Sequence, residues 1–231
     1  MDQPSEFWRS RLKTPSYRIR DAADYANLSS QTVTNWHCKP GSNRRSTLSV
    51  KERGSSLSYL QLIEVAVVAS FRKAGVPLKN IRSARDFMQD KLGAEFPFAE
   101  YRFKTEGREL WLDYAQFDPK ADDSTLMVVS KGGQFGWSSI IGRLKEFDYE
   151  TDGLAIRWHL MGRKNNLIID PRIQFGAPSV HGVSTSVIKG RWECGETLSD
   201  LAYDYAISEA DVELALDFEG YDHAARRATR H

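Results

Sequence analysis

The chain has 231 residues, of which 41% are hydrophobic, 11% aromatic and 27% charged, and its formal net charge is +1. These proportions are typical of a globular protein and exclude wholesale disorder. The chain has no run of about 18 apolar residues that could span a membrane, and its N-terminus lacks the apolar core of a secretion signal. Cys38 and Cys194 are isolated, which excludes a CxxC pair. We therefore expect a cytoplasmic protein with reduced thiols.

The small net charge conceals a difference between two parts of the chain. Residues 1–90 hold 15 Lys and Arg against 8 Asp and Glu, whereas residues 91–231 hold 17 against 23. Between Trp192 and Ala225 there are ten acidic residues and no Lys or Arg. A basic segment suits nucleic acid and an acidic one does not, so we predict different partners for the two parts.

The first elements in chain order are predicted to be helices. After a polar arm over residues 1–15, residues 17–37 predict two short helices joined by a tight turn. Residues 38–59 are rich in Gly, Ser, Pro and Arg, which predicts a loop or a two-stranded wing. Residues 59–75 and 76–93 each carry an apolar stripe at helical spacing and end at a glycine, so they predict two further helices.

After residue 100 the sequence consists of short segments in which apolar and polar residues alternate. Residues 101–114, 125–137 and 147–160 each predict a β-hairpin, and the Asp-Gly pair in the last of them is the strongest turn signal. Residues 166–180 predict a short strand and a loop, and helices are predicted from about residue 185 to residue 218. The fold class is therefore predicted to be α+β, with helices at both ends and hairpins in the centre.

Two stretches share the spacing of a helix-turn-helix. In such a unit a small residue lies where the helices cross, and a turn residue follows four positions later. These residues are Ala23 and Asn27 in the first stretch, and Ala202 and Ala206 in the second. Asparagine tolerates the left-handed conformation that such a turn often needs. Ser29 or Ser30 in the first stretch, and Ser208 in the second, can cap the second helix.

The two stretches differ in the side chains that the second helix exposes. In the first stretch these are small hydrogen-bonding groups that can reach base edges or phosphates, namely Ser30, Gln31, Thr32, Thr34 and Asn35. Basic residues that can neutralise phosphates surround this helix or lie in the predicted wing, namely Arg18, Arg20, Lys39, Arg44, Arg45, Lys51 and Arg53. We predict that the first stretch binds DNA.

The second stretch offers carboxylates, which DNA repels, so we predict that it faces a protein. The carboxylates are Glu209, Asp211 and Glu213. Acidic residues at a helix start also complement the helix dipole, which is an alternative explanation for them.

The first 93 residues resemble the MerR-like winged-helix family. The resemblance rests on YRIRDAADYANLSSQTVTNW, on the basic linker and on LSYLQLIEVAVVASFRKAGVPLKNIRSA. It implies a DNA-binding winged helix-turn-helix supported by a helix pair. The long dimerising coiled coil of that family is missing and hairpins replace it, so its ligand and metal sensing are not carried over.

The C-terminal part resembles a small helical domain of VapB-type antitoxins, which accompany PIN-like ribonuclease toxins. The resemblance rests on IIDPRIQFGAPSVHGVSTSVI and on GETLSDLAYDYAISEADVELALDFE. Where that family usually has Gly-Thr-Arg, this chain has Gly182, Val183 and Ser184. The resemblance implies a type II antitoxin, without enzymatic activity or cofactor, that binds and silences a PIN-like toxin and represses its own operon.

The contacts with such a toxin can be predicted in two ways. The acidic surface can cover the RNA-binding surface of the nuclease by charge complementarity. Alternatively, Arg172 or Arg191 can reach the carboxylates that hold Mg²⁺ in a nuclease of this kind. The turn at Asp170-Pro171-Arg172 is either functional or simply held by the aspartate side chain.

We expect three domains: a DNA-binding domain over residues 1–93, a hairpin domain over 94–165 and an acidic helical domain over 166–231. We also expect a homodimer that places two recognition helices about 34 Å apart on a palindromic operator. The alternative is a stand-alone MerR-like transcriptional regulator whose C-terminal domain senses a ligand or dimerises. A third possibility is an enzyme that acts on nucleic acid, although the chain has no histidine spacing typical of a metal site and no catalytic triad pattern.

Overall fold

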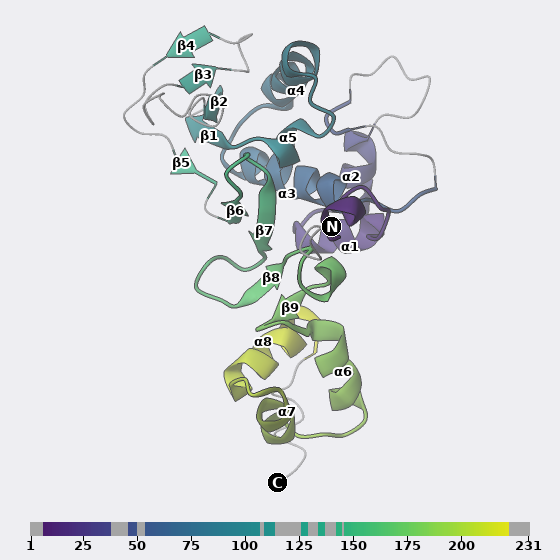
Figure 1. Cartoon of the computed structure of the whole chain (residues 1–231). Coiled ribbons are helices and arrows are strands. Elements are labelled where there is room, and N and C mark those ends of the chain that lie inside the picture. The colour runs from purple at the N-terminus through teal and green to yellow at the C-terminus, as the bar shows by residue number, and fades with distance from the viewer. Residues whose placement is uncertain are drawn as a thin grey trace. The chain divides into compact units, whose positions relative to one another are not determined.

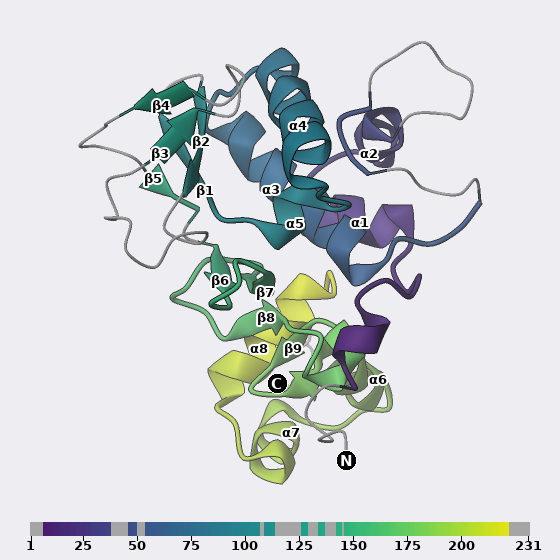
Figure 2. The ribbon, with the colours of Figure 1, turned by 45° about the horizontal axis from the view of Figure 1, so that its top comes forward.

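The structure is a computed structural model that describes residues 7–37, 46–49, 54–106, 109–113, 126–128, 134–136, 142–144 and 146–221. The chain divides into two compact units, residues 1–156 (unit 1) and residues 157–231 (unit 2). Figure 1 shows the elements of both units and Figure 2 shows the same ribbon after a rotation. The three domains predicted from the sequence stay a prediction.

Helices form the first part of unit 1. They are η2 (Arg9–Arg11), α1 (Ile19–Tyr25), α2 (Ser30–Trp36), α3 (Tyr59–Lys73), α4 (Leu78–Leu92) and α5 (Pro97–Glu100). Before α3, the Ser58 hydroxyl accepts the N–H of Gln61, whose side chain accepts the N–H of Ser58 in return. α4 follows Pro77 and ends at Gly93, whose φ of 64° is left-handed, so both predicted ends of this helix are confirmed.

α3 is the central helix of unit 1. The predicted apolar stripe is buried, and the burial extends to every residue from Tyr59 to Val68. A helix that is covered on all sides is largely apolar all round, so its periodicity does not reveal how much of it is buried. At one end of the core the rings of Phe71, Phe98 and Phe103 pack together, with centroids 5.5–5.7 Å apart.

An antiparallel sheet follows in unit 1. Its strands are β1 (Phe103–Glu106), β2 (Glu109–Asp113), β3 (Leu126–Val128), β4 (Gln134–Gly136) and β5 (Gly142–Arg143), in the order β4-β3-β2-β1-β5. β1 pairs with β2 with Glu106 opposite Glu109, and β3 pairs with β4. These pairings confirm the first two predicted hairpins.

The third predicted hairpin is also confirmed. β6 (Phe147–Tyr149) and β7 (Ala155–His159) are neighbours in a second antiparallel sheet of order β10-β9-β8-β7-β6. At the turn, the N–H of Glu150 donates to the carbonyl of Leu154 at 2.8 Å, and Gly153 has a φ of 94°. The division between the two units falls inside β7.

Unit 2 combines the remaining strands with helices. Its elements after β7 are β8 (Leu167–Ile169), η5 (Gln174–Gly176), β9 (Ser179–Val180), β10 (Val183–Ser184), α6 (Thr185–Glu193), α7 (Leu198–Tyr205) and α8 (Glu209–Phe218). Figure 1 shows the three helices grouped beside β8 and β9. They enclose a core of Leu167, Val180, Ile188, Trp192, Leu198, Leu201, Val212, Ala215 and Leu216.

The mixture of helices and antiparallel sheets agrees with the predicted α+β class. The predicted wing lies largely outside the described residues, because residues 38–45 and 50–53 are not among them. Next to these gaps, Leu57 and Tyr17 form an isolated antiparallel bridge. The winged arrangement therefore stays a prediction.

Candidate functional site

α1 and α2 form the first helix-turn-helix at the predicted place. Ala23 is fully buried and Asn27 has a left-handed φ of 53°. The N–H of Leu28 donates to the carbonyl of Ala23 at 2.8 Å and closes the turn. The hydroxyl of Ser29 accepts the N–H of Thr32 at 3.1 Å and caps α2. The predicted crossing, turn and cap are confirmed.

α2 has one buried face and one polar face. Val33 and Trp36 are buried. The other side chains are exposed or half-buried and include the predicted DNA contacts, Ser30, Gln31, Thr32, Thr34 and Asn35. On this polar face the Nε2 of Gln31 donates to the Oδ1 of Asn35 at 2.9 Å. The pair is thus held one turn apart on a surface that a nucleic acid can reach.

Two of the predicted phosphate contacts lie on the same helix pair. Arg18 and Arg20 are exposed at the start of α1. The Nε of Arg20 lies 3.8 Å from a carboxylate oxygen of Asp24, and such an exposed pair is weak enough for a phosphate to displace. The other predicted contacts lie outside the described residues, namely Lys39, Arg44, Arg45, Lys51 and Arg53.

α7 and α8 repeat the geometry of the first helix pair. Ala206 has a left-handed φ of 52°, and the N–H of Ile207 donates to the carbonyl of Ala202 at 3.1 Å. The hydroxyl of Ser208 accepts the N–H of Asp211 at 3.1 Å and caps α8. The second predicted helix-turn-helix is confirmed as a fold element.

The three carboxylates predicted to face a partner have different surroundings. Glu209 is exposed and Glu213 is half-buried. Asp211 accepts a hydrogen bond from Asn166 at 3.3 Å and lies 3.3 Å from the ring of His181. Burial raises the pKa of Asp211, but bonds from the cap serine and Asn166 outweigh burial, so its pKa lies below its usual range. Asp211 therefore stabilises unit 2 itself, whereas Glu209 is the exposed carboxylate of the three.

Three exposed residues of α7 were not singled out by the sequence analysis. Tyr203 on α7 is 86% exposed, and Asp200 and Asp204 on the same helix are also exposed. The apolar stripe of α7 passes through Leu198 and Leu201 and leaves Tyr203 off it, which is the sequence signal that could have identified this residue.

Arg191 is held by residues of unit 2. Its Nε donates to Glu196 at 2.7 Å, and one of its terminal nitrogens pairs with Asp204 at 2.5 Å. Its guanidinium also lies 5.1 Å from the centre of the Tyr205 ring. These contacts join α6 to α7. To reach a carboxylate of a partner, Arg191 has to exchange them.

Asp170 is fully buried and its carboxylate binds two arginines. It accepts the backbone N–H and the Nε of Arg172, both at 2.9 Å, and the Nε of Arg157 at 3.1 Å. Burial raises the pKa of Asp170, but the hydrogen bonds and charges of the two arginines outweigh burial and hold the pKa below its usual range. The turn at Asp170-Pro171-Arg172 is therefore held by the aspartate side chain, one of the two predicted possibilities.

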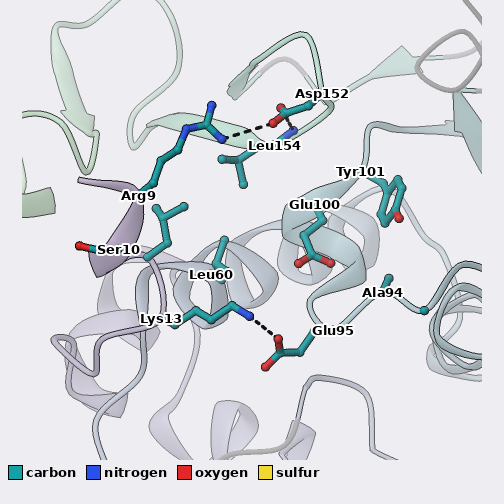
Figure 3. Close-up of a pocket in the computed structure, with 12 residues that line it drawn as sticks. Arg9, Ser10, Lys13, Leu60, Ala94, Glu95, Glu100, Tyr101, Asp152 and Leu154 are labelled. Atoms are coloured by element: carbon teal, nitrogen blue, oxygen red, sulfur yellow. Dashed lines mark hydrogen bonds and ion pairs between the residues drawn. The ribbon is translucent and has the colours of Figure 1, made fainter. Parts of the chain in front are cut away.

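Unit 1 contains a pocket of about 680 Å³, which is shown in Figure 3. This volume lies in the range of small-molecule sites. Its charged lining residues have partners within unit 1: Arg9 lies 3.5 Å from Asp152, Lys13 pairs with Glu95, and Glu100 accepts the backbone N–H of Phe96 at 3.1 Å. The pocket thus has no charge pattern that favours one class of ligand.

Within the described ranges, no group of three or more His, Cys, Asp or Glu side chains is arranged to hold a metal ion. The helices described there are also too short or too polar to cross a membrane.

The chain resembles a known protein in sequence and a solved structure in fold. No family model matches the chain. The chain is 26% identical over 230 residues to a Mycobacterium tuberculosis protein named "Putative antitoxin VapB45", with 90% of this chain and 95% of that protein covered. The crystal structure of Rv2018 from Mycobacterium tuberculosis matches with a TM-score of 0.60 and 22% identity, over 89% of this chain and 99% of that one.

The two matches support different statements. The sequence match identifies a distant relative whose name describes it as a putative antitoxin. The structural match shows that a solved fold covers most of the chain.

Proposed function

We propose that the chain is the antitoxin of a type II toxin–antitoxin system. In this proposal unit 2 binds and neutralises a PIN-like ribonuclease toxin, and α2 represses the operon of the pair by binding its operator. The observation that carries the proposal is the similarity, over 90% of the chain, to a protein named as an antitoxin.

The polar face of α2 supports the DNA-binding half of the proposal. Gln31 and Asn35 are exposed on a helix that is capped and anchored by buried residues, and such amide side chains can read base edges in a major groove. Arg18 and Arg20 lie on the neighbouring α1, where they can bind phosphates. A homodimer would place two copies of α2 on a palindromic operator.

The acidic surface of α7 and α8 supports the toxin-binding half. Glu209 and the highly exposed Tyr203 belong to the second helix pair, which repeats the fold of the first but offers carboxylates in place of amides. A ribonuclease needs basic groups to bind RNA, and a carboxylate surface can occupy them.

The test is to express the product of the neighbouring gene alone and together with this chain. We expect the neighbour to arrest growth alone, and to be harmless and to co-purify with this chain when both are present. The purified complex should bind the DNA upstream of the gene pair, with an affinity that falls steeply with salt. DNA binding without a toxic or co-purifying neighbour would overturn the antitoxin function and favour a stand-alone regulator.

A further inference from the structure

A short buried segment of unit 1, residues 46–49, is bonded to the end of α2, and we call it the strap. Thr47 and Leu48 are fully buried, and Ser49 is 3% exposed. The carbonyl of Trp36, the last residue of α2, accepts the N–H of Thr47 at 3.0 Å and that of Leu48 at 3.2 Å. The strap therefore satisfies a carbonyl at the end of the helix that carries the predicted DNA contacts.

Side chains bond the strap to other helices of unit 1. The carboxylate of Glu64 on α3 accepts the N–H of Ser49 at 3.0 Å. The Nε of Arg82 on α4 donates to the hydroxyl of Thr47 at 3.0 Å. The Nδ1 of His37, directly after α2, donates to the carbonyl of Ser49 at 3.1 Å. Since α2 has only seven residues, its stability depends on such tertiary contacts, and the strap connects it to α3 and α4.

Glu64 accepts two backbone hydrogen bonds, which requires both oxygens of its carboxylate. One oxygen accepts the N–H of Ser49, and the other accepts the N–H of Phe98 on α5 at 3.5 Å. A protonated carboxyl group and a glutamine amide each keep one good acceptor oxygen, and the other group donates a hydrogen. In either case one of the two N–H groups faces a donor. The strap is therefore held most firmly when Glu64 is ionised.

The surroundings of Glu64 place its titration near neutral pH. Its complete burial raises the pKa to about 7, and the two N–H bonds and the charge of Arg85 on α4 offset burial only in part. Glu100 on α5 accepts the N–H of Phe96, and His37 contacts the strap from the end of α2. A change in the ionisation of Glu64 thus changes the hydrogen bonding of the strap in an accessible pH range.

We propose that Glu64 is a positioning residue for DNA binding, because its ionised carboxylate fixes α2, through the strap, in the orientation that fits a major groove. This inference rests on the proposed DNA-binding function of α2. Side chains that read base edges have to be held within about 0.5 Å of their productive geometry. A strap that loses one hydrogen bond constrains α2 less, so the affinity for the operator falls although Glu64 does not contact DNA.

The experiment compares the full chain with its Glu64→Gln variant in binding to the DNA upstream of the gene pair. Glutamine removes a negative charge, which by itself strengthens binding to DNA. We expect the opposite at about pH 8.5, a dissociation constant roughly tenfold higher than that of the parent chain, which is equivalent to one lost hydrogen bond. At about pH 5.5 Glu64 is protonated in the parent chain, so the two dissociation constants should be roughly equal there.

Two further variants separate positioning from a change of charge. Glu100→Gln removes the same charge from unit 1, and glutamine can still accept the N–H of Phe96, so this variant should bind at least as tightly as the parent chain at both pH values. Thr47→Val removes the hydroxyl that accepts from Arg82 and so loosens the strap from α4. It should weaken binding by a similar factor to Glu64→Gln, but equally at both pH values.

Equal dissociation constants of the parent chain and Glu64→Gln at the higher pH would overturn the positioning role. A ratio between them that does not change with pH would do the same, as would an equal loss in Glu100→Gln. If the parent chain does not bind this DNA at either pH, the proposed DNA-binding function fails and the positioning role fails with it, so the two failures are distinguishable.

Discussion

Asn27 and Ala206 occupy the same position in two helix pairs and have almost the same left-handed backbone, with φ of 53° and 52°. In each pair the next residue donates its N–H to the alanine where the helices cross, Ala23 in one and Ala202 in the other. The two turns are equivalent in geometry. The first has asparagine, which tolerates this backbone, whereas the second has alanine, which does not. The comparison predicts opposite effects of exchanging these residues.

Ala206→Asn should raise the free energy of unfolding of unit 2 by roughly 0.5–1 kcal/mol, because asparagine adopts the left-handed region more readily than alanine. Asn27→Ala should lower the free energy of unfolding of unit 1 by a similar amount. Denaturant unfolding of the single variants measures both. Ala210→Asn is the control, since Ala210 is exposed within α8 and asparagine there should be slightly destabilising. A loss of stability in Ala206→Asn would contradict the argument.

The stability of unit 1 should depend on pH through Glu64. This residue is fully buried on α3, and its carboxylate accepts the N–H of Ser49 at 3.0 Å and that of Phe98 at 3.5 Å. Burial raises the pKa of Glu64 to about 7 from an ordinary 4.5, and these bonds and the charge of Arg85 offset burial only in part. Between these two pH values the folded chain binds more protons than the unfolded chain. The free energy of unfolding should therefore fall by about 3 kcal/mol as the pH rises from 4.5 to 7.

Glu64→Gln removes this titration and should flatten the dependence of unfolding on pH in that window. Urea unfolding at several pH values gives the slope for the variant and the parent chain. Glu95→Gln provides the comparison, because it makes the same substitution at a side chain that is 59% exposed. An unchanged slope in Glu64→Gln would mean that another group controls the pH dependence.

Two variants of the first helix pair should affect DNA binding differently. Arg20→Ala removes one of the proposed phosphate contacts, so it should weaken binding to all sequences and reduce the salt slope by about one. Gln31→Ala removes a proposed contact to a base edge, and should cost about 1–3 kcal/mol and relax the preference at one base pair. Titrations of operator and mutated operator at several salt concentrations separate these effects. Lys164 is an exposed basic residue of unit 2, and Lys164→Ala should change neither the salt slope nor the base preference.

Charge reversal at Glu209 should affect only toxin binding. Glu209→Lys places a positive charge on the acidic surface, which should slow association with a basic ribonuclease and make the rate less dependent on salt. Operator binding should be unaltered. Asp90→Lys makes the same change at an exposed position on α4 in unit 1. Equal losses in both variants would indicate a general effect of net charge, and the role of the α7–α8 surface would then be rejected.

Local signals explain what could be predicted from the sequence. The turn at Asn27, the end of α4 at Gly93 and the hairpin at Gly153 each depend on residues within a few positions, and all three are present. The burial of α3 on all sides depends on helices and strands far along the chain, so its periodicity did not show it. The partners of Arg172 and Arg191 and the cap formed by Asp211 also required coordinates.

The border between the two units inside β7 has a practical consequence for truncation. Ala155 accepts a hydrogen bond from the Tyr59 hydroxyl at 3.2 Å in unit 1, whereas Trp158 and His159 pair with β8 in unit 2. A fragment that starts at Leu160 removes both of these pairing residues and leaves β8 as an open edge strand, which is prone to aggregate. A fragment intended to represent unit 2 by itself should therefore begin before Trp158.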